Sequence, residues 1–337
     1  MRIAVMGMGV AGSYLMARLR DTGHDAVGYE RSTSERHDSI CAWGTIRPVL
    51  EEFCRKTGRN FGDFLIHDGH RMDVRMSGGV EFGIGLHGLC TYNKLGLIKD
   101  FIKDCDVRYG EAPKLERLNQ DYDMIVDCTG FHRSYLPRLK RDFFLPTYEY
   151  KVEYENGVPY DDFYIEPFPG MSGYFWYFPL GPSTAHIGAG DYNKNHVKAT
   201  DAFLKKHGGR VLATKGRPIR LATPGHCKPY HLGKVVGVGE SIGTVYALLG
   251  EGIIPSMQCV EIFLENMDDF EAYERAVEKH FAVYDKVFGF VHKKIHRNFS
   301  MIKSIPDVIA IYRYMKRNED RFGMDIKMAD LMKVAKA

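Results

Sequence analysis

Three glycines and one acid near the N-terminus have the types and the spacing of a nucleotide-phosphate site. Gly7, Gly9 and Gly12 stand between an apolar run and a helical run, and Glu30 ends the next apolar run. In such a motif Gly7 makes the tight turn, Gly9 lets the backbone approach a pyrophosphate, and Gly12 lets the helix pack closely on the strand. Glu30 would then accept hydrogen bonds from an adenosine ribose, and its charge argues against a 2′-phosphate.

The elements that must position these residues are a strand, a helix and a second strand between residues 2 and 30. The helix would begin at Val10 and Ala11, so its N-terminus faces the phosphates. Arg31 follows the acid directly and is assigned to the same site.

Later segments continue the same kind of domain. Residues 122–130 and 233–240 each read as an apolar strand that ends in a glycine turn, and residues 250–264 read as a turn followed by a helix. The residues of these segments that we expect at the cofactor are Asp127, Gly130, Gly239, Glu240, Gly250, Gly252 and Ile253.

The whole chain limits the possible classes of protein. With 337 residues it can bury a large core, and its net charge of +3 does not call for nucleic acid as a partner. Seven cysteines show neither a disulfide framework nor a zinc spacing, which indicates a reducing cytoplasm and no metal site. Because the first strand is expected to start at residue 2, we expect no signal peptide, and no apolar run has transmembrane length.

We therefore predict an α/β fold with three parts. A discontinuous nucleotide-binding domain takes residues 1–80, 92–145 and 225–265. Residues 146–224 alternate aromatic and polar residues between turns, which favours an antiparallel β-rich substrate domain, with 81–91 as a candidate addition. Residues 266–337 form a helical C-terminal region, in which Phe270, Tyr273 and Val277 fall at helical spacing.

One aromatic segment and one loop are the candidates for substrate contact. Tyr174, Trp176 and Phe178 alternate along an expected strand, so they share one face and could line a wall for an apolar chain. The alternative is that all three are ordinary core residues of a β-sheet. Cys41 and Gly44 lie in the loop after the second strand.

These segments resemble the geranylgeranyl reductases, FAD-dependent oxidoreductases of the p-hydroxybenzoate hydroxylase superfamily. Residues 174–179 match the family's Y-x-W-x-F-P signature, and Cys41 matches its active-site cysteine, although Ala42 and Trp43 stand where the family has glycines. The resemblance implies a Rossmann-type FAD-binding domain. It also implies that Glu240 reaches the ribityl or ribose hydroxyls, that the turn at 250–253 faces the flavin pyrimidine, and that Lys94 is a candidate FAD contact.

The implied activity is the saturation of isoprenoid double bonds in a lipid or polyprenyl substrate by hydride from reduced FAD, with Cys41 or water as the proton relay. NAD(P)H or a reduced carrier protein would donate the electrons. Two alternatives stay open: a flavin-dependent monooxygenase or halogenase of the same fold, and an electron-transfer flavoprotein.

The C-terminal region adds a possible membrane contact. Residues 286–337 contain 12 Lys or Arg against 5 Asp or Glu. An apolar stripe accompanies this charge, at Ile295, Phe299, Ile302, Ile305, Ile309, Tyr312 and Met315. Such a segment can lie on an anionic bilayer as a peripheral contact, or it can cap a domain with a solvated face.

Overall fold

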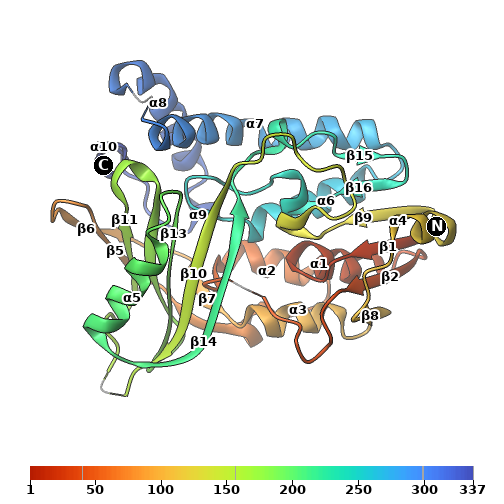
Figure 1. The fold of residues 1–337 in the computed structure, drawn as a ribbon, viewed down its shortest axis with the longest axis horizontal. Coiled ribbons are helices and arrows are strands. Elements are labelled where there is room, and N and C mark those ends of the chain that lie inside the picture. Colours follow the sequence, from red (N-terminus) through yellow and green to blue (C-terminus); the bar gives the residue numbers. More distant parts are fainter. Residues whose placement is uncertain (40, 156, 298–299, 337) are drawn as a thin grey trace.

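The computed structural model describes residues 1–39, 41–155, 157–297 and 300–336. It contains a parallel sheet with helices around it, a large antiparallel sheet, and a group of C-terminal helices over the junction of the two (Figure 1). The α/β architecture and the helical C-terminal region expected from the sequence are both present.

The parallel sheet contains both strands that flank the glycine motif. β1 is an apolar run buried from Ile3 onward, and it lies between β2 and β9. All pairings in this sheet are parallel except that of β15 with β16. The strand order is β15 (His231–Leu232), β16 (Val235–Gly237), β9 (Met124–Asp127), β1 (Arg2–Met6), β2 (Asp25–Glu30) and β8 (Val107–Tyr109).

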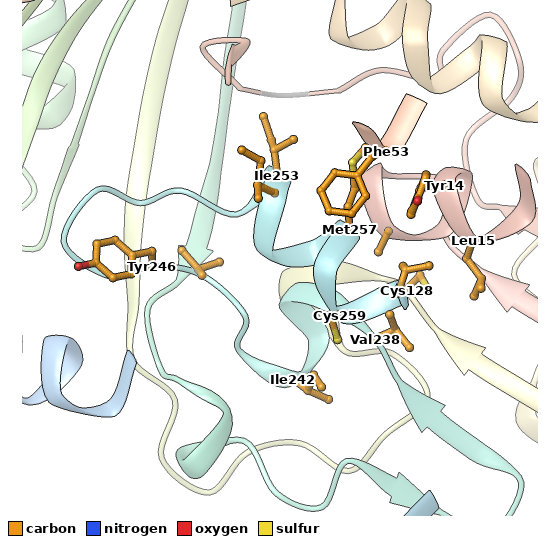
Figure 2. Close-up of a cluster of buried hydrophobic side chains, with 14 of the residues drawn as sticks. Tyr14, Leu15, Phe53, Cys128, Val238, Ile242, Tyr246, Ile253, Met257 and Cys259 are labelled. Carbon is orange, nitrogen blue, oxygen red and sulfur yellow. The ribbon is translucent and has the colours of Figure 1, made fainter. Parts of the chain in front are cut away.

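Five helices belong to this lobe: α1 (Val10–Leu19), α2 (Arg47–Arg55), α3 (Lys94–Ile102), α4 (Leu115–Asp121) and α6 (Ile253–Glu265). α1 and α6, far apart in the chain, pack against each other, and Figure 2 shows Tyr14 of α1 near Met257 of α6 in the apolar cluster between them. The Tyr14 hydroxyl also donates to Glu261 Oε1 at 2.6 Å. This contact ties the C-terminal half of α6 to the helix that follows the glycine motif.

The large sheet has seven strands and is antiparallel except where β5 pairs with β11. Its order is β14 (Arg210–Arg220), β10 (Phe144–Glu153), β13 (Thr184–Asp191), β12 (Gly173–Pro179), β11 (Phe163–Pro167), β5 (Arg71–Arg75) and β6 (Glu81–Gly85). α5 (His196–His207) packs on β13 and β10.

The position of β5 corrects one predicted boundary. The predicted nucleotide-binding domain includes residues 71–75, but Phe163 of β11 pairs with Met72 and brings them into the large sheet. The partner strand is remote in the chain, so local periodicity carries no sign of the pairing. A smaller sheet consists of β3 (Gly44–Ile46), β7 (Leu89–Tyr92) and β4 (Leu65–Asp68), whose strands precede and follow β5 and β6 in the chain.

The C-terminal helices are α7 (Phe270–Ile295), α8 (Met301–Arg317), α9 (Glu319–Phe322) and α10 (Met328–Lys336). α7 confirms the helical spacing of Phe270, Tyr273 and Val277, since the latter two are fully buried. Short 3₁₀ helices are η1 (Phe61–Phe64), η2 (Gly130–His132), η3 (Pro169–Met171), η4 (Pro224–His226) and η5 (Gly239–Ile242). Within the described residues, no helix is long and apolar enough to cross a bilayer.

Candidate active site

The glycine turn after β1 has the shape that its sequence predicts. Gly7 adopts φ +90°, and a Cβ on Gly12 would lie 1.9 Å from the Gly7 carbonyl oxygen, so neither position accepts a side chain. A Cβ on Gly9, in contrast, would meet no atom within 4 Å. Gly7 and Gly12 therefore hold the turn closed, whereas Gly9 borders open space at the N-terminus of α1, as a pyrophosphate requires.

Glu30 closes the same cradle from β2. Its carboxylate accepts hydrogen bonds from the backbone N–H groups of Met8, at 3.0 Å, and Ser32, at 2.9 Å. The bond from Met8 ties the acid to the glycine turn, the bond from Ser32 holds it to its own loop, and Glu30 also lines the cavity described below. Arg31 beside it lies 3.3 Å from the ring of His132.

A single cavity of about 1010 Å³ extends from this cradle to the large sheet and the C-terminal helices. It is large enough for a sizeable cofactor and a second molecule. The predicted site residues that line it are Gly7, Gly9, Val10, Ala11, Glu30, Arg31, Cys41, Gly44, Lys94, Gly130, Tyr174, Trp176, Phe178, Glu240, Gly250, Gly252 and Ile253.

Gly12, Asp127 and Gly239 do not line the cavity. Asp127 is fully buried, and its carboxylate accepts hydrogen bonds from Thr129 and from the N–H groups of Tyr135 and Leu136. The structure thus corrects its expected role: with its lone pairs used in this way, Asp127 shapes the loop after β9 instead of reaching the cofactor. Gly12 and Gly239 act by allowing close approach, the latter at φ +78° beside Ala11.

Glu240 lies at the junction of the two lobes. Its carboxylate pairs with Arg217 at 2.6 Å and accepts the N–H of Arg220 at 2.9 Å. A Cβ on Gly130 would lie 3.1 Å from Glu240 Oε2. Glu240 therefore links β14 to η5 at the cavity wall, and its charge is shared with Arg217.

The turn before α6 leaves amide groups free. Gly250 has φ +62°, Gly252 is the N-cap of α6, and no described side chain caps that helix end. Unpaired N–H groups and the helix dipole favour a partial negative charge there. Such charge accumulates at N1 and O2 of a flavin on reduction, so this turn fits the flavin ring and the Gly9 turn fits its pyrophosphate.

The loop with Cys41 retains a glycine-like backbone. Trp43 adopts φ 63°, a conformation that side chains rarely take, although it stands where the resembling family has glycine. Its indole packs against the ring of His186, with centroids 5.0 Å apart, and the Lys151 ammonium lies 5.1 Å from the indole centroid. These two contacts offset a backbone cost of roughly 1–2 kcal/mol.

The aromatic residues of β12 line the cavity as the alternation predicts. The Tyr174 hydroxyl donates to the Leu249 carbonyl at 2.5 Å, which joins this strand to the turn at Gly250. Phe178 packs over Gly44, where a Cβ would lie 2.5 Å from the ring. Trp176 is 8% exposed, so it is both a cavity residue and a buried one.

Sequence reasoning missed a buried acid of this wall, Glu149 on β10, and the buried His186 on β13 beside it. Glu149 accepts the Cys41 N–H at 3.1 Å, and its other oxygen lies 3.8 Å from His186 Nδ1. Burial raises the pKa of Glu149 to about 7 and lowers that of His186 to about 3. One signal in the sequence could have indicated Glu149. It alternates with Leu145 and Thr147 along the strand, so the three share the face that lines the cavity.

It also missed the apolar end of the cavity, where β5, β6 and β11 face the C-terminal helices. The apolar residues that line this chamber are Met72, Val74, Phe82, Ile84, Ile165, Ile295, Met315, Phe322, Met324, Ile326, Leu331 and Val334. An isolated bridge between Leu86 and Met324 holds the segment between α9 and α10 to the sheet, and Figure 1 shows α10 beside the end of β11.

This packing changes the interpretation of the C-terminal stripe. Ile295 and Met315 face the cavity, and Ile305 is 46% exposed. Phe299 lies outside the described residues, as does the side chain of Ile302. At least part of the expected membrane face is therefore used inside the protein.

Comparison with solved structures agrees with this arrangement. The chain is similar to a geranylgeranyl bacteriochlorophyll reductase-like protein from Thermoplasma acidophilum, with a TM-score of 0.64 at 15% identity, over 95% of this chain and 98% of the other. A flavin-dependent halogenase from a Brevundimonas species gives 0.69 at 13% identity, over 92% and 84%. A probable FAD-dependent monooxygenase from Pseudomonas aeruginosa gives 0.64 at 15% identity, over 88% and 95%.

No protein-family model matches the sequence, and no curated protein matches it. At these identities the likeness concerns the fold, which is that of the Rossmann-type FAD-binding flavoenzymes. Within the described residues, no group of His, Cys, Asp and Glu could hold a metal ion.

Proposed function

We propose that this protein is an FAD-dependent oxidoreductase that saturates isoprenoid double bonds in a lipid or polyprenyl substrate. The observation that carries the proposal is the continuity of one cavity from the Gly9 turn to the apolar chamber at α10. An elongated apolar molecule could lie in that chamber with one end near the turn at Gly250. The aromatic side chains of β12 would form the wall between the two.

When bound, FAD would supply the hydride. The residues of this chain would bind, orient and exclude water. The Gly9 turn and Glu30 would hold the pyrophosphate and the ribose, and the free amides before α6 would stabilise charge on the ring. Tyr174, Trp176 and Phe178 keep the reacting end dry. We infer that the electrons come from NAD(P)H or from a reduced carrier protein.

The test is an anaerobic single turnover. The protein would be purified with its flavin, reduced, and mixed with a geranylgeranyl lipid. After quenching, the mass of the lipid product would be measured by mass spectrometry. A gain of two hydrogens per double bond supports the proposal. Reduced protein that stays reduced and leaves the lipid unchanged contradicts it.

The likeness to a monooxygenase and a halogenase supports a second candidate of the same fold. The same lipid, presented in air with NAD(P)H, separates the two. Oxygenated or halogenated product that forms only with oxygen would assign the protein to that class, and oxygen-independent saturation would exclude it.

A further inference from the structure

Glu149 is a buried acid at the end of the cavity near Cys41. Its one hydrogen bond to a described residue does not explain why an acid is buried there. It lies in the middle of β10, is 3% exposed and lines the cavity. Oε1 is held by the N–H of Cys41. Oε2 makes no hydrogen bond to any described residue, so one oxygen is anchored and the other is free.

The groups around Glu149 do not neutralise it by direct pairing. Lys94 of α3 is buried in the same wall but lies beyond ion-pair distance, and Lys215 of β14 is paired with Asp38. His186 of β13 lies 3.8 Å from Oε2, and its two ring nitrogens have no hydrogen-bond partner among the described residues. An ionised carboxylate in this place would be buried with one oxygen unpaired, which is costly.

The balance of these effects favours a neutral acid. Burial is the largest effect on Glu149 and raises its pKa to about 7, with Asp38 acting in the same direction. Lys94, the Cys41 N–H and Lys215 lower the pKa but do not cancel the burial. A carboxyl group with a pKa near neutrality can release a proton and recover it at working pH.

We propose that Glu149 is the catalytic acid that donates the proton to the substrate double bond. The π bond breaks as one carbon receives the hydride with its electron pair, and the Oε2 proton moves to the other carbon. Glu149 is left as the carboxylate and regains a proton from solvent before the next turnover. This proposal rests on the proposed function, because it needs an alkene and a two-electron-reduced flavin.

The first experiment measures the proton without any substrate. Infrared difference spectra of the flavin-loaded protein near pH 6 should show the carbonyl stretch of a protonated carboxyl group, which titrates near pH 7 and is missing in Glu149→Gln. Glu153→Gln is the matched control, since Glu153 lies four residues further along β10 on the same face and pairs with Arg210 at the surface. Absence of the band from the parent protein, or its persistence in Glu149→Gln, overturns the proposal.

The second experiment measures the transfer. In anaerobic single turnovers with a geranylgeranyl lipid, Glu149→Gln should be at least about 100-fold slower with unchanged flavin content, and Glu149→Asp should recover part of the rate. The parent rate should fall as pH rises through about 7, whereas the residual Glu149→Gln rate should be flat. Glu149→Gln within threefold of the parent, with Cys41→Ser strongly impaired, would assign the proton to the thiol and overturn the proposal.

The two experiments also separate this proposal from the proposed function. A protein that shows the carboxyl band but saturates no isoprenoid contradicts the proposed function, and with it proton transfer to an alkene. A protein that saturates the lipid equally well with glutamine at position 149 contradicts only the role of Glu149.

Discussion

At Gly9 an added side chain would enter the cavity without touching protein. We expect Gly9→Val to fold normally and to lose FAD, with binding weakened at least tenfold, because the branched side chain would fill the pyrophosphate path. Flavin absorbance of the purified protein and its thermal midpoint measure the two effects.

Gly289 provides the control for that substitution. A Cβ on Gly289 would also meet no atom within 4 Å, but this residue lies on α7 and does not line the cavity. Gly289→Val should retain its flavin. Equal flavin content in both variants would remove the Gly9 turn from the cofactor site.

Glu149 and His186 make opposite contributions to the pH dependence of stability. The pKa of Glu149 is raised from 4.5 to about 7 on folding, so its contribution is fully present below pH 4.5 and is lost as pH rises through 7. The pKa of His186 is lowered from 6.5 to about 3, so its contribution is present above pH 6.5 and is lost as pH falls. Between pH 4.5 and 6.5 the two slopes oppose each other.

Replacing Glu149 should therefore remove its contribution to the pH dependence of the free energy of unfolding and leave that of His186. Glu149→Gln should match the parent near pH 4.5 and exceed it at pH 8 by about 3 kcal/mol in free energy of unfolding, the equivalent of the shift in the Glu149 pKa. Urea unfolding at a series of pH values measures this. A constant difference between the two proteins across that range would contradict a raised pKa at Glu149.

Among the elements, α9 and the turn before α6 are joined by one ion pair. Arg321 and Glu251 are 2.5 Å apart, with side chains 12% and 16% exposed. Glu251 Oε1 and Arg321 Nη1 have no described hydrogen-bond partner, so the pair is incompletely satisfied. Removing one partner leaves the other charge buried, which typically costs about 3–5 kcal/mol.

We expect Arg321→Met to destabilise the protein by roughly 3 kcal/mol, and Arg321→Met with Glu251→Gln to be more stable than Arg321→Met alone. Chemical denaturation of the four proteins of this cycle gives the coupling. Strict additivity of the two substitutions would show that the pair does not fix α9 to the turn.

Elements defined by local pattern could be predicted from the sequence. The strand, helix and strand around Gly7 to Glu30, the strands of 144–220 and the helix α6 all follow from periodicity and glycine positions. The parallel pairing of β5 with β11 and the packing of α10 over the chamber could not, because both depend on partners remote in the chain.

The same reason explains the site residues. Gly9 and Glu30 belong to a motif whose chemistry is local, so their positions were predictable. Glu149 has no motif, and its properties come from burial, from Cys41 and from Lys94, which three separate segments bring together. Asp127 shows the opposite. It stands at the end of a strand like a cofactor-binding acid, but its carboxylate accepts hydrogen bonds from its own loop.

For the molecule as a whole, the C-terminal helices set the size of the apolar chamber. Leu331 of α10 lines it, so Leu331→Trp should fill part of the chamber and shift the preferred substrate toward shorter prenyl chains by about tenfold in relative rate, with flavin content unchanged. Competition between lipids of two chain lengths measures the shift.

Ala329→Trp is the matched control, because Ala329 lies on the same helix but faces solvent. It should leave chain-length preference as in the parent protein. The same preference in both tryptophan variants would mean that α10 does not limit the substrate.

The pairing of β16 with β9 has a consequence for how the chain acquires this fold. Val235 pairs with Ile125, and strands β10 to β14 lie between them in the chain. Closing so long a loop costs entropy before its contacts form, so we expect the parallel sheet to be completed late in folding. Until then β9 presents an unpaired edge, a template for pairing with other chains. Fragments that stop before residue 235 keep that edge open, and they will aggregate where the longer chain folds.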